Sequence, residues 1–170
     1  MPADAKRLVV TGAAGFVGSH LVREFSAQGY DVIAADRRAE GLQCLAALPG
    51  VSVRVGDLTD AHYCADLIAD VHGVVHCAGV SRVSSAVNAP LDALQSTVLA
   101  SGNLFAALRR RGNMWLVVVS TREVETLLAN PAGVSALADL YGVCKLTVEQ
   151  LARTFCLDSG IPLVICRLSD

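Results

Sequence analysis

The sequence has 170 residues, 53% of them hydrophobic and 18% charged, which predicts one compact domain over residues 1–170 rather than a disordered chain. A formal net charge of −2 gives no attraction to nucleic acid, and no apolar stretch is long enough to cross a bilayer. Six cysteines without a C-x-x-C pair favour reduced thiols, no metal site and a cytoplasmic protein.

Short apolar, β-branched runs alternate with helical patterns along the chain. The runs are continuously apolar, which is typical of parallel strands buried on both faces of a sheet. Strands are expected at 7–11, 30–35, 51–55, 73–77, 114–119 and 162–167, and helices near 16–28, 39–48, 60–70, 90–110 and 136–158. Right-handed crossovers then favour a doubly wound α/β sheet of six strands in the order 3-2-1-4-5-6. A ligand crevice is expected at the carboxyl ends of strands 1 and 4.

The first strand is followed by Gly12, Gly15 and Gly18, with Phe16 and Val17 between them at the start of the first helix. One glycine permits a tight turn, one lets the backbone approach a phosphate, and one lets the helix pack closely on the strand. The unpaired N–H groups and the positive end of the helix dipole would then meet the phosphate charge. This arrangement predicts a cradle for a dinucleotide pyrophosphate.

The second strand ends at Asp36, which lies 18 residues after Gly18. A carboxylate there accepts hydrogen bonds from a free ribose 2′-hydroxyl and repels a 2′-phosphate, which favours NAD over NADP. Arg37 and Arg38 follow directly, and either guanidinium could bind a 2′-phosphate. We therefore expect NAD and keep NADP as the alternative.

Two further strand ends face the same crevice. Asp57 and Leu58 follow the third strand, where a carboxylate and an apolar side chain can border an adenine ring. Cys77, Ala78 and Gly79 follow the fourth strand, where small residues let the backbone lie against the central sugars and phosphates of a dinucleotide. We expect all five residues to contact the cofactor.

Tyr141 and Lys145 are four residues apart and share one face of a predicted helix. The phenol pKa of about 10 is too high for a base at neutral pH, but a nearby cation favours the phenolate. The lysine can also hydrogen-bond the nicotinamide ribose. Thr121, at the end of the fifth strand, is preferred over Ser120 as the hydroxyl that binds a substrate oxygen, because it lies further out of the strand. The alternatives are an exposed cation packed along a tyrosine, and a cap or turn role for Thr121.

Taken together, these motifs resemble the extended short-chain dehydrogenase/reductases, and specifically the NAD-dependent epimerase/dehydratase family of nucleotide-sugar enzymes. The resemblance covers the whole chain and is carried by Thr11-Gly-Ala-Ala-Gly-Phe-Val-Gly18, Asp36, Asp57-Leu58, His76-Cys-Ala-Gly79, Ser120-Thr121-x-x-Val124 and Tyr141-x-x-x-Lys145. The stretch from His76 through Pro90 to Asn103 is similar to the UDP-hexose epimerases.

The resemblance implies a Rossmann domain in which Tyr141 is the base, Lys145 lowers its pKa and binds ribose, and Thr121 supplies a hydroxyl. It also implies that hydride leaves a sugar carbon for NAD while the tyrosinate takes the hydroxyl proton. An epimerase then returns the hydride to the other face of the sugar. The implied partner is a nucleotide sugar.

Two of the chain's departures from the family bear directly on its function. Family dehydratases carry Thr-Asp-Glu where this chain has Thr121-Arg122-Glu123, so the acid expected for elimination is missing and dehydration is disfavoured. In the family, a strand like 161–167 is followed by a smaller lobe that binds the nucleotide sugar. That lobe is expected to be absent here, which makes the chain either a fragment or a natural short form.

Two other functions and one assembly state also follow from the residues. Arg37 and Arg38 are compatible with an NADP-dependent reductase of small or hydrophobic carbonyls, and the expected lack of a substrate lobe is compatible with a non-catalytic NAD(H)-binding module. The helix near 136–158 has apolar residues on more than one face, which predicts a homodimer. These residues are Leu137, Leu140, Val143, Leu146, Val148, Leu151 and Phe155.

Overall fold

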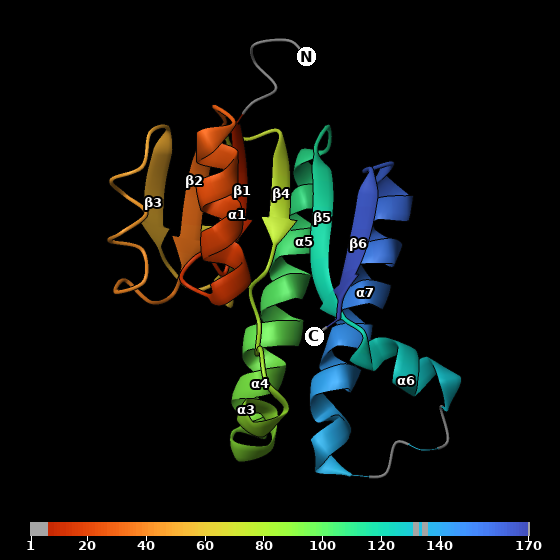
Figure 1. The fold of residues 1–170 in the computed structure, drawn as a ribbon. Helices are drawn as coiled ribbons and strands as arrows, with labels where there is room; N and C mark the ends of the chain where they lie inside the picture. Colours follow the sequence, from red (N-terminus) through yellow and green to blue (C-terminus); the bar gives the residue numbers. More distant parts are fainter. Residues whose placement is uncertain (1–6, 131–132, 134–135, 170) are drawn as a thin grey trace.

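The computed structural model describes residues 7–130, 133 and 136–169. These residues form a sheet of six parallel strands in the order β3-β2-β1-β4-β5-β6 (Figure 1). The strands are β1 (Arg7–Thr11), β2 (Asp31–Asp36), β3 (Val51–Val55), β4 (Gly73–His76), β5 (Trp115–Thr121) and β6 (Leu163–Leu168). The observed order confirms the doubly wound α/β sheet predicted from the sequence.

Helices cover both faces of this sheet. The described helices are α1 (Phe16–Ala27), α2 (Ala61–Leu67), α3 (Val83–Asn88), α4 (Pro90–Ala93), the π-helix η2 (Leu94–Leu99), α5 (Ala100–Arg111), α6 (Glu123–Ala129), the 3-10 helix η4 (Leu137–Asp139) and α7 (Leu140–Ser159). α1 lies on one face, whereas α5 and α7 lie on the other (Figure 1). The short helices α3, α4 and α6 lie beyond the carboxyl ends of the strands (Figure 1).

The central strand β1 is buried on both of its faces, as predicted. Leu8 and Val10 belong to the apolar cluster under α1, and Val9 belongs to the cluster under α5 and α7. These three side chains are at most 1% exposed. Burial on both faces explains why the strand is apolar at successive positions rather than at alternating ones.

The prediction of burial on both faces is wrong for the two edge strands. Val53 and Val55 of β3 are 36% and 55% exposed, and Val164 and Leu168 of β6 are 54% and 44% exposed. An edge strand has a neighbour on one side only, and the described helices do not cover these side chains. Apolar residues form strands here although one face of the strand stays exposed, because strand propensity reflects fit to a pleated, half-buried surface.

The helix expected at 39–48 is also wrong, because the described chain forms consecutive turns there. Leu45 N–H donates to Leu42 O at 2.9 Å, which is an i to i+3 bond. Leu42 and Leu45 are both 1% exposed and pack under α1, so a three-residue repeat directs both side chains toward the sheet. Gly41 passes so close to Ala14 that an added Cβ would lie 2.4 Å from the Ala14 Cβ. Contacts with the core therefore override helix propensity in this short crossover.

The helix expected at 90–110 is present but divided. α4 and α5 are joined by η2, whose turn is wider than that of an α-helix. Within η2, Thr97 is fully buried, its Oγ1 accepts a hydrogen bond from Val80 N at 3.0 Å, and its carbonyl accepts one from Ser101 Oγ at 2.5 Å. The sequence did not indicate α3 or α6, which are short and lie at the carboxyl end of the sheet.

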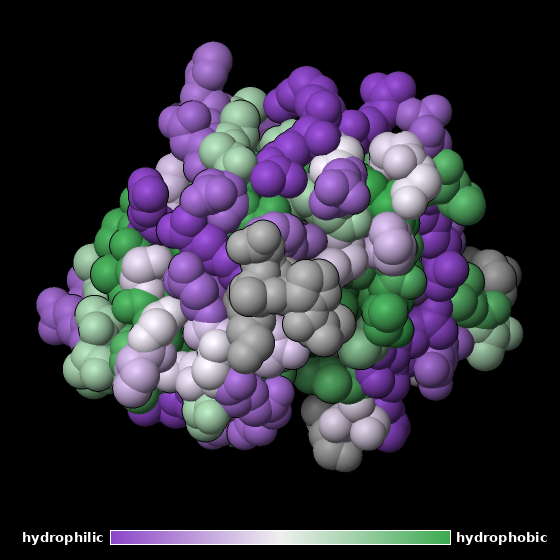
Figure 2. Space-filling view, turned by 90° about the horizontal axis from the view of Figure 1, so that it is seen from above, coloured by the Kyte–Doolittle hydropathy of each residue, from purple (hydrophilic) through white to green (hydrophobic). Residues whose placement is uncertain are grey.

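The end of the molecule at which the strands begin carries many polar side chains interspersed with apolar ones (Figure 2). At this end Arg7 pairs with Asp31, with 3.3 Å between Nε and Oδ2, and also with Asp70. Within the described part of the chain, no helix has the length and apolar character needed to span a bilayer. The short helices and the strand ends that carry the predicted site residues lie at the opposite end.

Candidate cofactor and active site

A cleft of about 970 Å³ lies at the carboxyl ends of the strands. Every residue predicted for the site lines it, although these residues come from five strand ends and from α7. They are Gly12, Gly15, Phe16, Val17, Gly18, Asp36, Arg37, Asp57, Leu58, Cys77, Ala78, Gly79, Thr121, Tyr141 and Lys145. The cleft is large enough for a dinucleotide and lies where doubly wound sheets bind their ligands.

The three glycines of the loop after β1 differ in their backbone conformation and in the space around them. Gly12 has φ +69°, and an added Cβ would lie 2.7 Å from Ala78 N. An added Cβ on Gly18 would lie 2.3 Å from Gly12 O, so the helix packs directly on the loop. Gly15 has looser surroundings, with Gly12 O at 3.2 Å from an added Cβ, and it lines the cleft. The loop therefore forms a cradle of bare backbone that fits a pyrophosphate.

The amino end of α1 opens into this cradle. Its N-cap is Gly15, which has no side chain to accept a hydrogen bond, and its first turn has no acidic residue. The first N–H groups of any helix lack acceptors within the helix, and they carry the positive end of its dipole. Phe16 and Val17 line the cleft beside these groups. An anion in the cleft would supply the missing acceptors.

Asp36 holds the glycine loop from the end of β2. Its side chain is 8% exposed, and its Oδ2 accepts a hydrogen bond from Ala14 N at 3.0 Å. Its Oδ1 accepts a bond from Arg38 N at 3.0 Å and lies 3.6 Å from Arg38 Nε. Arg37 Nη1 lies 3.3 Å from Asp92 Oδ1 of α4. Arg37 and Arg38, which made NADP an alternative cofactor in the sequence analysis, are thus both paired with carboxylates.

The turn after β3 is held by a residue that the sequence did not indicate. Asn103 Nδ2 donates to Leu58 O at 3.1 Å and to Thr59 O at 2.9 Å. Asp57 Oδ1 accepts a hydrogen bond from Thr59 N at 2.8 Å, and the Leu58 side chain is buried. From α5, the amide of Asn103 therefore fixes the turn that carries Asp57 and Leu58, the two residues predicted to border the adenine.

Tyr63 is a second unpredicted residue at this end of the cleft. Its ring lies where a Cβ on Gly56 would be, 2.2 Å from the Tyr63 Cε2 atom. Its hydroxyl donates to Arg54 O at 3.3 Å, and burial raises the pKa of the phenol to about 12. A neutral aromatic ring beside Asp57 and Leu58 adds apolar surface for a flat base.

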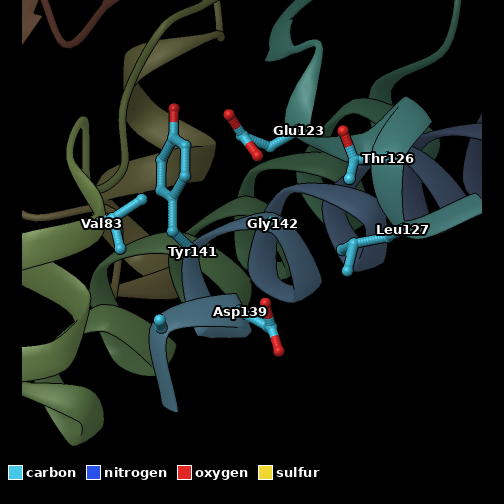
Figure 3. A pocket seen from close by; sticks show the side chains of 8 residues that line it. Val83, Glu123, Thr126, Leu127, Asp139, Tyr141 and Gly142 are labelled. Carbon is cyan, nitrogen blue, oxygen red and sulfur yellow. The ribbon is translucent and has the colours of Figure 1, made fainter. Parts of the chain in front are cut away.

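Tyr141 lies between the large cleft and a smaller pocket of about 50 Å³. Figure 3 shows its ring extending from α7 between Val83 of α3 and Glu123 of α6. Thr126 and Leu127 of α6 line the other side of this pocket. The short helices that the sequence did not indicate therefore form the surroundings of the predicted base.

Lys145 is placed by the end of β5. Its side chain is largely buried, and its Nζ donates to Val119 O at 3.1 Å. Burial lowers the pKa of the ammonium, and the neighbouring Cys77, Cys144 and Glu149 oppose this shift. A cation with little solvent around it interacts strongly with nearby groups in the cleft.

The two candidate hydroxyls of β5 differ in their partners. Ser120 Oγ donates to Glu149 Oε1 at 2.6 Å inside the protein, so its proton is already in use. Thr121 Oγ1 accepts a bond from Glu123 N at 3.4 Å and lines the cleft. Thr121 therefore keeps a proton to donate and stays the candidate for the substrate-binding hydroxyl.

Glu149 and Arg167 form an ion pair that the sequence motifs did not indicate. Glu149 is fully buried on α7, and Arg167 of β6 donates to both of its oxygens. Burial raises the pKa of Glu149, but the hydrogen bonds from Arg167 and Ser120 outweigh this effect and leave it lowered. The sequence does hold one signal for this pair, because Glu149 is a charged residue four positions after Lys145 inside an apolar helix.

His76 carries a second buried network. Its Nδ1 is 2.8 Å from Thr11 Oγ1, and its Nε2 is 2.8 Å from Ser101 Oγ. Because the Ser101 hydroxyl donates to Thr97 O, it accepts from the histidine, which places the proton on Nε2. Burial, with a smaller effect of Lys145, lowers the pKa of His76 to about 3. The neutral ring thus joins β1 and β4 to η2 and α5.

A doubly wound parallel sheet with a glycine cradle at its switch point defines a Rossmann-like dinucleotide-binding domain. The NAD dependent epimerase/dehydratase family model matches residues 8–170, and the chain belongs to this family. The family resemblance inferred from the motifs is therefore confirmed, and NAD, predicted from Asp36, is the cofactor of the family.

Curated and solved relatives agree with this membership. A dTDP-glucose 4,6-dehydratase of Mycolicibacterium smegmatis is 32% identical, with 96% of this chain and 53% of the relative covered. A UDP-glucose 4-epimerase of Yersinia enterocolitica is 29% identical, with 88% and 48% covered. The structure of a Thermus thermophilus UDP-glucose 4-epimerase in complex with NAD superposes with a TM-score of 0.78 at 27% identity, covering 95% of this chain and 54% of that one. The chain spans about half the length of the curated relatives it matches.

Proposed function

We propose that this chain supplies the NAD-binding half of an enzyme that transfers hydride between a carbinol carbon of a nucleotide sugar and the nicotinamide. The observation that carries the proposal is that Tyr141, Lys145 and Thr121 line the same cleft as the glycine cradle and Asp36. The two curated relatives are named for reactions of dTDP-glucose and UDP-glucose, which supports a nucleotide-sugar substrate.

The residues of the cleft suit the successive parts of NAD. The backbone at Gly12, Gly15 and Gly18 and the amino end of α1 would hold the pyrophosphate. The carboxylate of Asp36 keeps lone pairs that can accept from the adenosine ribose hydroxyls. Asp57 and Leu58 would border the adenine, and residues 77–79 would lie against the central sugars and phosphates. When bound, NAD would supply the hydride acceptor.

The proton chemistry falls to α7 and β5. Tyr141 would take the proton from the sugar hydroxyl, because the Lys145 cation on the same helix face favours the phenolate. Lys145 would also donate a hydrogen bond to the nicotinamide ribose. Thr121 would donate a hydrogen bond to the substrate oxygen as it changes between alcohol and ketone.

Among the outcomes open to this chemistry, epimerase or simple dehydrogenase activity is favoured over dehydration. Arg122 stands where family dehydratases have an aspartate, so the acid for water loss is missing. The reductase alternative loses support, because Arg37 and Arg38 are both paired with carboxylates rather than left for a 2′-phosphate.

The test is incubation of the complete protein with NAD and a panel of UDP-, GDP- and dTDP-sugars. We expect NADH or an epimerised sugar with at least one of them, and loss of turnover in Tyr141→Phe with NAD binding retained. Full activity of Tyr141→Phe would overturn the assignment of the base. NAD binding without turnover would leave the non-catalytic module, and no binding of NAD or NADP would reject every form of the proposal.

We also propose that two copies associate through α7. Leu137 is 51% exposed at the start of this helical segment, and Val143 and Leu146 stay half-buried in the single chain. Pairing of the helices would remove this apolar surface from water. Light scattering should give twice the mass of one chain, and a strict monomer would contradict the dimer.

A further inference from the structure

We propose that Asp92 determines the choice between NAD and NADP by holding Arg37 away from the ribose 2′ position. The pair joins two elements that border the cleft, since Arg37 follows β2 and Asp92 belongs to α4. Arg37 Nη1 and Asp92 Oδ1 are 3.3 Å apart, and both residues line the cleft. This inference rests on the proposed cofactor site and adds a specificity residue to it.

Three carboxylates, those of Asp92, Asp57 and Asp36, act on Arg37. The hydrogen bond to Asp92 is the main reason that the pKa of Arg37 is raised, and the charges of Asp57 and Asp36 act in the same direction. Arg38 faces Asp36, with 3.6 Å between Nε and Oδ1. A 2′-phosphate entering here would therefore meet three carboxylates and no unpaired guanidinium among these residues.

Asp92 is the member of this group that can be changed without dismantling the site. Asp36 accepts the Ala14 N–H of the glycine loop, and Asp57 accepts the Thr59 N–H, so each holds backbone in place. The Asp92 side chain is 50% exposed and pairs with Arg37, which is also 50% exposed. Removing its charge would free the guanidinium and would also lessen the repulsion of a phosphate.

The pair is modest in strength because both partners reach solvent. The expected effect is correspondingly moderate: Asp92→Asn should raise the affinity for NADP relative to NAD by about fivefold to tenfold. Asp92→Glu keeps the charge and should keep the preference for NAD. Asp92→Asn combined with Arg37→Gln should lose the gain, because the freed guanidinium is its source.

The experiment is titration calorimetry of the chain with NAD and with NADP for these variants. Asp158→Asn is the matched control, because Asp158 and Arg109 form an ion pair with side chains 57% and 54% exposed that do not line the cleft. An unchanged NADP to NAD ratio in Asp92→Asn, or a gain that survives Arg37→Gln, would overturn this inference alone. An original chain that binds neither dinucleotide would overturn the inference together with the proposed function.

Discussion

The guanidinium of Arg167 donates to both oxygens of Glu149, with 2.9 Å from Nε to Oε1 and 2.8 Å from Nη2 to Oε2. Ser120 of β5 donates to the same carboxylate, and Lys145, one helical turn earlier, donates to Val119 O. The helix α7 therefore holds two successive residues at the end of β5. This clamp fixes the strand that carries one proposed catalytic residue against the helix that carries the other two.

The first prediction concerns this clamp. Glu149→Gln should lower the free energy of unfolding by about 2 kcal/mol, because it removes the charge from a buried carboxylate that accepts hydrogen bonds from Arg167 and Ser120. Urea unfolding measures the change. Glu125→Gln is the control, since Glu125 is 64% exposed and 3.7 Å from Arg167, and its loss should cost less than about 1 kcal/mol. Equal costs for the two variants would contradict the clamp.

The second prediction separates structural glycines from incidental ones. Gly18→Ala should destabilise the chain and abolish NAD binding, because an added Cβ would lie 2.3 Å from Gly12 O. Gly102→Ala in α5 has no atom within 4 Å of an added Cβ and should stabilise the chain by up to about 1 kcal/mol. Thermal unfolding with and without NAD distinguishes the two. NAD binding by Gly18→Ala at the original affinity would refute the cradle.

The third prediction divides the hydroxyls of β5 by role. Ser120→Ala removes a donor to the buried Glu149 and should cost about 1–2 kcal/mol of stability. Thr121→Ala should leave stability almost unchanged but slow hydride transfer by about a hundredfold, because the substrate oxygen loses a donor. Urea unfolding and the absorbance of NADH are the two measurements. The opposite pattern would assign the catalytic hydroxyl to Ser120.

The fourth prediction concerns pH. The pKa of His76 is about 3 in the folded chain, far below the usual value near 6.5 in an unfolded chain. Between these values the unfolded state binds a proton that the folded state does not, so stability falls as pH falls. From pH 6.5 to pH 5 the loss from this residue should be about 1.5 kcal/mol.

The comparison that isolates this effect is between two histidine variants. In urea unfolding, the free energy of unfolding of His76→Gln should depend less on pH than that of the original chain. The difference should correspond to the uptake of one proton on unfolding. His62→Gln is the matched control, because it removes an exposed histidine and leaves His76 in place. Carboxylates such as Glu149 contribute alike to all three proteins and cancel. An unchanged dependence in His76→Gln would show that His76 does not carry the effect.

Strand order, the glycine cradle and the gathering of the predicted site residues in one cleft could be predicted from the amino-acid sequence. Continuous apolar runs such as Leu8, Val9 and Val10 are typical of strands buried inside a parallel sheet, and parallel strands bring their carboxyl ends to one edge. Local rules therefore sufficed to place Gly12 and Tyr141 in one cleft, although they are far apart in the chain.

The pairing of polar groups across elements emerges only in the folded chain. The partners Glu149 and Arg167, or Arg37 and Asp92, lie 18 and 55 residues apart and follow no local period. The turns at 39–48 and the π-helix at Leu94–Leu99 likewise depend on neighbours that the local sequence does not specify. Local propensity is worth a few tenths of a kcal/mol per residue, and buried contacts are worth several times more, so packing decides wherever the two disagree.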